Sequence, residues 1–198
     1  MSARHNVSAE EAKQILIAGN ERFMDHANEA VATASHGRYK LTNGQSPFAI
    51  ILNCADSRVV PEVAFDQGLG DIFVVRVAGN IANPSSIASI EYAVAHLGTN
   101  LIVVLGHEAC GAVGAAIDVA KNPGTDLGPN LNHLVSFITP AVEQTGGGDV
   151  AETVKCNANV SADQLVNDSA ILKQYVDSGD LKIMPAYYNL GSGKVDFL

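Results

Sequence analysis

The chain has 198 residues and a formal net charge of −9, and 47% of its residues are hydrophobic. This length and composition suit one globular domain with a sizeable core. The acidic charge disfavours binding to phosphate backbones, so we expect no nucleic-acid partner. The longest apolar runs fall far short of the roughly 20 residues that span a bilayer, so we expect no membrane partner.

The cysteine content and the first residues bear on the cellular compartment. The chain has three cysteines, Cys54, Cys110 and Cys156. A small, odd number of cysteines in a chain of this length does not indicate a disulfide framework. The segment from Met1 to Asn6 lacks the apolar core of a signal peptide. We therefore expect a cytoplasmic protein, or a periplasmic one if an export signal has been removed. In a reducing compartment such as the cytoplasm, cysteines near His and Asp suggest metal ligands or nucleophiles.

The N-terminal part of the chain predicts a helical arm from about residue 8 to 40. Ser8 is a suitable N-cap, the acids after it suit the helix dipole, and Ala9 to Phe23 carries an apolar stripe. The apolar residues from about His26 to Gly44 follow no clear period, so we expect a loop or an irregular helix there.

Alternating strands and helices are predicted in an α/β core from about residue 45 to 198. The strands are apolar runs typical of buried parallel strands, and the helices lie between or after them. The expected strands are Phe48–Cys54, Ile72–Val77 and Leu101–Leu105, and the expected helices are Pro84–Leu97, ended by Gly98, and Gly111–Ala120. This alternation predicts a parallel sheet with helices on both faces.

The remaining chain is predicted to be mainly helical until a late strand. The better helical segments are Leu131–Ala141 and Ser161–Tyr175, and the strand is Leu181–Tyr187. A turn at Gly191–Gly193 then leads into a short final extension. No linker divides the chain, so we expect a single α/β domain over residues 1–198, with a central, mainly parallel sheet flanked by helices.

A group of metal-binding residue types lies at two strand ends. Cys54 ends the first predicted strand, and His107 and Cys110 lie just past the third. Because ligands of open α/β sheets bind beyond the carboxyl ends of the strands, we expect these residues to converge. Thiolates and imidazole are preferred Zn²⁺ donors, and three protein ligands with one open position form a catalytic site. The alternative, two core cysteines beside a core histidine, is disfavoured by polar neighbours such as Asp56 and Arg58.

Asp56 is a possible fourth ligand. In an extended turn, Asp56 and Arg58 point the same way and can pair, which keeps the carboxylate ionised and turned away from the metal. The fourth position is then left to water. Without the pair, Asp56 can bind zinc itself and close the site, so an active and an inhibited arrangement both remain open.

These residues resemble the β-class carbonic anhydrases. Cys54-Ala-Asp-Ser-Arg58 matches the family signature Cys-x-Asp-Ser-Arg, and Gly106-His-Glu-Ala-Cys-Gly111 matches Gly-His-x-x-Cys-Gly. The resemblance runs from about Ala9 to the C-terminus, with further matches at Ala18–Phe23, Val74–Asn80, Ser89–Val94 and Tyr188–Gly193. It implies the family fold and a homodimer, or a tetramer or larger assembly, in which the N-terminal helix reaches onto a partner.

The resemblance also implies zinc-dependent, reversible hydration of carbon dioxide to bicarbonate and a proton. Cys54, His107 and Cys110 would bind zinc, and Asp56 and Arg58 would form the catalytic dyad. Zinc lowers the pKa of bound water to about 7, so we expect hydroxide to attack carbon dioxide while Asp56 orients it.

Other pocket residues follow from the same resemblance. Gln45 matches an amide that hydrogen-bonds the substrate, and Gly111 would offer its backbone N–H group. Phe73 and Tyr92 match aromatic residues that the plant-type branch supplies from a neighbouring subunit, with core packing as the alternative for Phe73. The other branch replaces the glutamine and keeps a tryptophan at an inhibitory bicarbonate site, where Arg76 would match an arginine. This chain has no tryptophan, so the plant-type branch is favoured.

His96 is the expected proton shuttle. It follows Tyr92 by four residues on a predicted helix, so the two side chains share a face. An unperturbed histidine pKa of about 6.5 suits proton transfer. The resemblance also places a proposed shuttle at this position. A surface histidine with no such role is the alternative.

Two other functions remain open. A hydrolase of carbon disulfide or carbonyl sulfide would carry the same zinc ligands on the same scaffold. A non-catalytic zinc scaffold would hold its metal permanently in four protein ligands, and it would need neither Arg58 nor Gln45.

Overall fold

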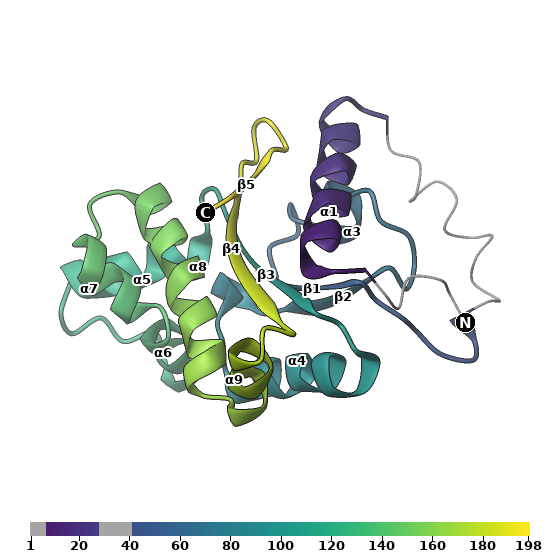
Figure 1. Cartoon of the computed structure of the whole chain (residues 1–198). Helices are drawn as coiled ribbons and strands as arrows, with labels where there is room; N and C mark the ends of the chain where they lie inside the picture. The colour runs from purple at the N-terminus through teal and green to yellow at the C-terminus, as the bar shows by residue number, and fades with distance from the viewer. Residues whose placement is uncertain (1–6, 28–40) are drawn as a thin grey trace.

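A computed structural model describes residues 7–27 and 41–198, and Figure 1 shows one sheet with helices around it. The strand order is β2-β1-β3-β4-β5, with every neighbouring pair parallel except the last. The strands are β1 (Ala49–Asn53), β2 (Ile72–Arg76), β3 (Leu101–His107), β4 (Lys182–Tyr188) and β5 (Val195–Phe197). The prediction of a mainly parallel α/β sheet in a single domain is confirmed. The expected final extension is the antiparallel strand β5.

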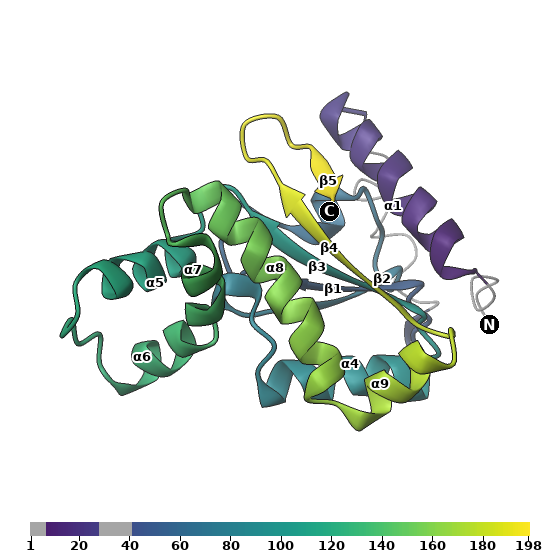
Figure 2. The ribbon, with the colours of Figure 1, turned by 60° about the vertical axis from the view of Figure 1, so that its left-hand side comes forward.

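The helices cover both faces of the sheet, as Figure 2 shows with α1 on one side and α4, α8 and α9 on the other. They are α1 (Ala9–Met24), α3 (Pro61–Ala64), the 3-10 turn η2 (Ala78–Asn80), α4 (Pro84–Leu97), α5 (Gly111–Lys121), α6 (Pro129–Ser136), α7 (Thr139–Thr145), α8 (Val150–Asn167) and α9 (Ala170–Asp177). Ala49 and Ile51 of β1 pack in the core cluster that includes residues of α1, whereas Ile50 and Leu52 pack in the cluster that includes residues of α4 and α8. Alternate residues of a strand point to opposite faces, so a strand covered on both sides is apolar throughout.

Capping side chains fix the starts of two predicted helices. Ser8 accepts a hydrogen bond from the Glu11 backbone N–H, and the Glu11 carboxylate accepts one from the Ser8 backbone N–H. Asn83 and Ser86 form the same reciprocal pair at the start of α4. Each pair satisfies backbone N–H groups that a helix end leaves without an internal partner.

The prediction of one helix over Leu131–Ala141 was wrong. α6 ends at Ser136, and α7 begins at Thr139 with Pro140 in its first turn. Proline lacks a backbone N–H group and fits a helix only in the first turn, so it begins a new helix here.

The prediction of a helix over Ser161–Tyr175 was also wrong. This range joins the end of α8 to most of α9, and Ser169 separates the two helices by capping the Leu172 backbone N–H. α8 itself begins at Val150, where the Asp149 side chain caps the first turn.

The expected irregular segment from His26 to Gly44 lies mostly outside the described residues. Within residues 7–27 and 41–198, no helix is long and apolar enough to cross a membrane.

Candidate metal centre

The carboxyl ends of β1 and β3 bring the three predicted ligands together. Cys54 directly follows β1, His107 is the last residue of β3, and Cys110 is the N-cap residue of α5. The two strands are adjacent and parallel, with Asn53 opposite Leu105. One ligand atom from each of the three residues lies within 4.8 Å of the others, and their exposed fractions are 5%, 0% and 1%.

The hydrogen bonding of His107 leaves one ring nitrogen available to a metal. Nδ1 lies 2.8 Å from the Glu108 carbonyl oxygen, and because a carbonyl can only accept, Nδ1 carries the proton. Nε2 is buried and has no hydrogen-bond partner in the described part of the chain. Leaving a buried nitrogen without a partner is costly, and a metal ion between the imidazole and the two sulfurs would satisfy it. The residues present therefore fit zinc.

A hydrogen bond between the two cysteine sulfurs shifts their pKa values in opposite directions. A hydrogen bond from the Cys110 thiol is the largest effect that lowers the pKa of Cys54, and it outweighs the burial that raises it. The same contact raises the pKa of Cys110. The Gly79 backbone N–H also donates to Cys54 Sγ at 3.4 Å. The contact therefore favours ionisation of Cys54 over Cys110, and a cation bound here would displace the proton that the two sulfurs share.

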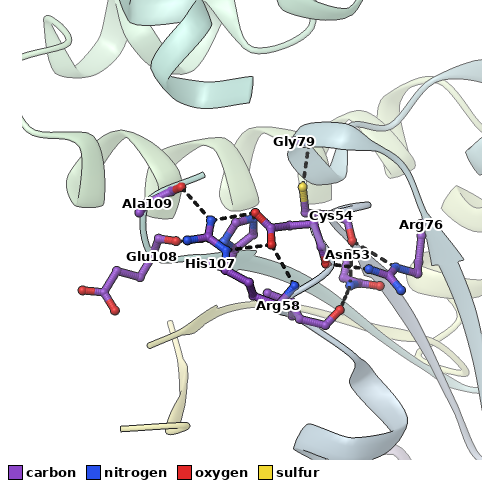
Figure 3. A network of polar contacts seen from close by, with 10 residues as sticks. Asn53, Cys54, Arg58, Arg76, Gly79, His107, Glu108 and Ala109 are labelled. Carbon is purple, nitrogen blue, oxygen red and sulfur yellow. Dashed lines mark hydrogen bonds and ion pairs between the residues drawn. The ribbon is translucent and has the colours of Figure 1, made fainter. Parts of the chain in front are cut away.

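Asp56 and Arg58 form a two-point ion pair next to His107, and Figure 3 shows Arg58 close to His107 and Cys54. Arg58 Nε donates to Asp56 Oδ1 at 2.9 Å, and Nη2 donates to Oδ2 at 2.7 Å. The hydrogen bond from the Arg58 side chain is the main reason that the pKa of Asp56 lies well below its ordinary value. Asp56 Oδ2 remains 3.9 Å from His107 Nε2, so the carboxylate borders the metal-binding cluster while bound to arginine.

A second arginine holds the backbone of this loop. Arg76 Nε donates to the Cys54 carbonyl oxygen at 3.2 Å, and Nη2 donates to the Asp56 carbonyl oxygen at 2.6 Å. Asn53 Nδ2 donates to the same Cys54 carbonyl at 2.9 Å. Sequence reasoning missed these contacts and connected Arg76 only with an inhibitory anion site. Their acceptors are backbone oxygens, so no pairing of side-chain types could have revealed them.

Gly79 has a structural reason to be glycine. Its φ is 71°, in the left-handed region, and an added Cβ would lie 2.7 Å from Ile138 Cδ1. Sequence reasoning included it in a matching segment but gave it no role at the metal site. The close approach of its backbone lets its N–H group reach Cys54 Sγ.

The other predicted pocket residues occupy several places. Gly111 is exposed at the start of α5 and lines a surface pocket of about 510 Å³ that also borders Cys110. Gln45 precedes β1 and therefore lies at the opposite end of that strand from Cys54, in a separate surface pocket. Phe73 is opposite Ile50 in the sheet and packs against the core cluster under α4.

Tyr92 and His96 lie together on α4. Tyr92 is 50% exposed, and its ring centroid lies 5.3 Å from that of His96. Both side chains come from a helix on one face of the sheet, whereas Cys54 and His107 lie at the carboxyl end of the strands. Gln45, Phe73, Tyr92 and His96 are therefore not gathered around the metal-binding cluster of their own chain.

Comparison with known proteins supplies a family. The family model described as carbonic anhydrase matches residues 49–195. The chain is 38% identical over 192 residues to carbonic anhydrase 2 of Mycobacterium tuberculosis, covering 96% of this chain and 92% of that protein. It is 42% identical over 189 residues to a carbonic anhydrase of Pseudomonas aeruginosa, covering 89% and 84%.

Solved structures agree with this result. The β-carbonic anhydrase of Coccomyxa, in complex with acetazolamide, superposes with a TM-score of 0.73 at 26% identity, covering 92% of this chain and 84% of that one. A tetrameric β-carbonic anhydrase of Sordaria macrospora has the same fold, with a TM-score of 0.73 at 23% identity and coverage of 94% and 96%.

Proposed function

Because this chain belongs to the β-class carbonic anhydrases, we propose that it catalyses the zinc-dependent, reversible hydration of carbon dioxide to bicarbonate and a proton. One observation carries the zinc-dependent mechanism. The ligand atoms of Cys54, His107 and Cys110 lie within 4.8 Å of one another, while the neighbouring Asp56 carboxylate is held by Arg58. That arrangement supports three protein ligands and one open position.

The donor set supports zinc as the metal. Two cysteines and one histidine form a known catalytic zinc ligand set, and a structural site would normally have four protein ligands. Zinc bound there would lower the pKa of a coordinated water molecule to about 7 and so supply a nucleophile at neutral pH.

The residues of the chain orient the reactants. The ionised Asp56 carboxylate can only accept hydrogen bonds, so it would hold the nucleophilic oxygen by its proton and turn a lone pair toward the carbon of the substrate. Arg58 would keep that carboxylate ionised and in place. The Gly111 backbone N–H and the Gln45 amide would donate to a substrate oxygen as charge develops on it.

Self-association completes the pocket in this proposal. Gln45, Phe73 and Tyr92 lie away from the cluster of their own chain, which supports their donation to the site of a neighbouring copy in a homodimer or a larger assembly. The related Sordaria protein is described as tetrameric. His96 beside Tyr92 would carry the released proton from the pocket to solvent.

Stopped-flow measurement of carbon dioxide hydration tests the proposed function. We expect zinc-loaded protein to be active, chelator-treated protein to be inactive, and added zinc to restore the rate. Cys156→Ser serves as a control because Cys156 lies on α8 outside the metal-binding cluster, so its rate should equal that of the wild type. Zinc-loaded protein without hydration at alkaline pH would refute the proposal, and turnover of carbonyl sulfide in its place would identify the alternative hydrolase.

A further inference from the structure

Glu108 lies in the sequence between His107 and Cys110, and its carboxylate extends away from His107 (Figure 3). Oε2 accepts hydrogen bonds from the backbone N–H groups of Leu190, at 2.9 Å, and Gly191, at 3.4 Å. The backbone N–H of Glu108 donates to the Tyr188 carbonyl oxygen at 2.9 Å. Its carbonyl oxygen accepts from His107 Nδ1 at 2.8 Å.

We propose that Glu108 is a positioning residue that sets the tautomer and orientation of His107 by anchoring the intervening peptide to the turn between β4 and β5. This inference rests on the proposed zinc function. Two polar groups of Glu108 bind the end of β4 and the turn, and the third faces the imidazole. With the first two fixed, the carbonyl oxygen stays aimed at Nδ1, and Nε2 keeps its lone pair toward the metal position.

An anchor is needed because the backbone is irregular at this point. The β3–β4 ladder ends with His107 opposite Tyr188, and α5 begins only at Gly111. Between them Ala109 has a φ of 53°, which is uncommon for a residue other than glycine. A segment outside regular structure holds its carbonyl groups in place only through specific contacts, and the Glu108 contacts extend the link to β4 beyond the last ladder pair.

The turn that receives Glu108 is itself held in place. Asn20 of α1 donates to the Gly193 carbonyl oxygen at 2.8 Å and accepts from the Val195 backbone N–H at 2.9 Å. Gly193 has a φ of 75° and sits against Phe23, where an added Cβ would lie 2.7 Å from the ring. The anchor therefore joins the metal centre to α1: the Glu108 contacts are half-buried or exposed, and the Asn20 contacts that hold the turn to α1 are buried.

Zinc affinity, measured on metal-free protein by competition with a chromogenic chelator, tests the proposal. We expect Glu108→Ala to weaken zinc binding about 10- to 100-fold, as loss of an indirect contact to a metal ligand typically does. Glu108→Gln keeps an acceptor of the same length and should lose less. Asp196→Asn is the matched control, because it removes an exposed carboxylate of the same hairpin that is paired with Lys194, and its affinity should be unchanged.

The absorption spectrum of the cobalt-substituted protein gives a second readout, because it reports ligand geometry independently of activity. We expect Glu108→Ala to change this spectrum and Asp196→Asn to leave it unchanged. If Glu108→Ala does not fold, Glu108→Asp decides, since it keeps the charge but shortens the reach and should bind zinc more weakly than Glu108→Gln.

The outcomes separate the two proposals. Wild-type and Glu108→Ala proteins with zinc affinities within about twofold of each other would overturn the positioning role and leave the proposed function intact. An equal loss in Asp196→Asn would also overturn it, because the effect would then belong to the hairpin as a whole. A wild-type protein that binds no zinc would overturn the proposed function, and the positioning role with it.

Discussion

At the scale of single residues, the proposed function depends on the protonation state of Asp56. The Arg58 side chain and backbone N–H both donate to its carboxylate, which lowers the pKa of Asp56. A carboxylate with a lowered pKa in the folded state stabilises the fold above its unfolded pKa of about 3.9, and this contribution is lost as the pH falls through the folded value. Asp56 therefore stays ionised and paired throughout the neutral and mildly acidic range.

Replacing Arg58 tests this pairing. In Arg58→Ala the pKa of Asp56 should rise toward its ordinary value, and the released carboxylate can turn to the metal. We expect carbon dioxide hydration to fall about 100-fold, the cost of misplacing a group near the reacting atoms, while zinc content stays constant. Stopped-flow rates and metal analysis provide the measurement. Lys173→Ala, which breaks an exposed pair with Asp177, is the control; loss of zinc from Arg58→Ala would show a different role for the arginine.

At the scale of elements, β3 approaches α8 closely at the residue before His107. Gly106 precedes the histidine, and an added Cβ would lie 2.8 Å from Val154 Cγ1 and 3.3 Å from the Val154 carbonyl oxygen. A side chain at this position would push the strand and helix apart. The absence of a Cβ thus permits the close packing beneath the metal centre.

Substituting alanine for a glycine in β3 and for one in α5 should change the free energy of unfolding in opposite directions. We expect Gly106→Ala to lower the free energy of unfolding by about 1–3 kcal/mol, because it overfills a packed contact. In Gly114→Ala the added Cβ meets nothing within 4 Å, so helix α5 should gain about 0.5–1 kcal/mol. Urea denaturation of the metal-free protein measures both. Equal stability of Gly106→Ala and the wild type would show that β3 can shift freely against α8.

The sequence predicted the strands well because β1 and β3 are buried on both faces and are apolar over Ala49–Leu52 and Leu101–Leu105. It predicted the convergence of Cys54 with His107 because strand ends in a parallel sheet share an edge. It failed for α8, where Asn157 and Ser161 are fully buried and weaken the apolar period. It also missed the contact of Glu108 with the Leu190 backbone, because a bond across 82 residues has no local signal.

At the scale of the whole molecule, one chain contains both the metal-binding cluster and the proposed substrate-binding amide, but the two lie far apart. The metal-binding cluster lies at the carboxyl end of the sheet, whereas Gln45 precedes β1 at the other end. A symmetric dimer can bring the amide of one copy to the metal of the other, because each surface then appears twice.

Mixing two impaired variants tests this arrangement. Asp56→Ala and Gln45→Ala should each lose about 100-fold in hydration rate. When equal amounts are unfolded together and refolded, half of the dimers are hybrids with one intact site, so about a quarter of the wild-type activity should return. A mixture of Asp56→Ala with Arg58→Ala is the control and should recover none. No recovery in the first mixture would mean that Gln45 serves its own chain.

The contact between Glu108 and the β4–β5 turn also sets an order of events during synthesis. Cys54, His107 and Cys110 leave the ribosome long before Leu190, which lies 82 residues after Glu108. At roughly 5–20 residues per second, that interval lasts about 4–16 s. Throughout it the nascent chain carries the metal-binding side chains without the anchor that aims the imidazole. Under the proposed function, metal captured early would be held by an incomplete centre, and the mature coordination geometry would form only with the last hairpin.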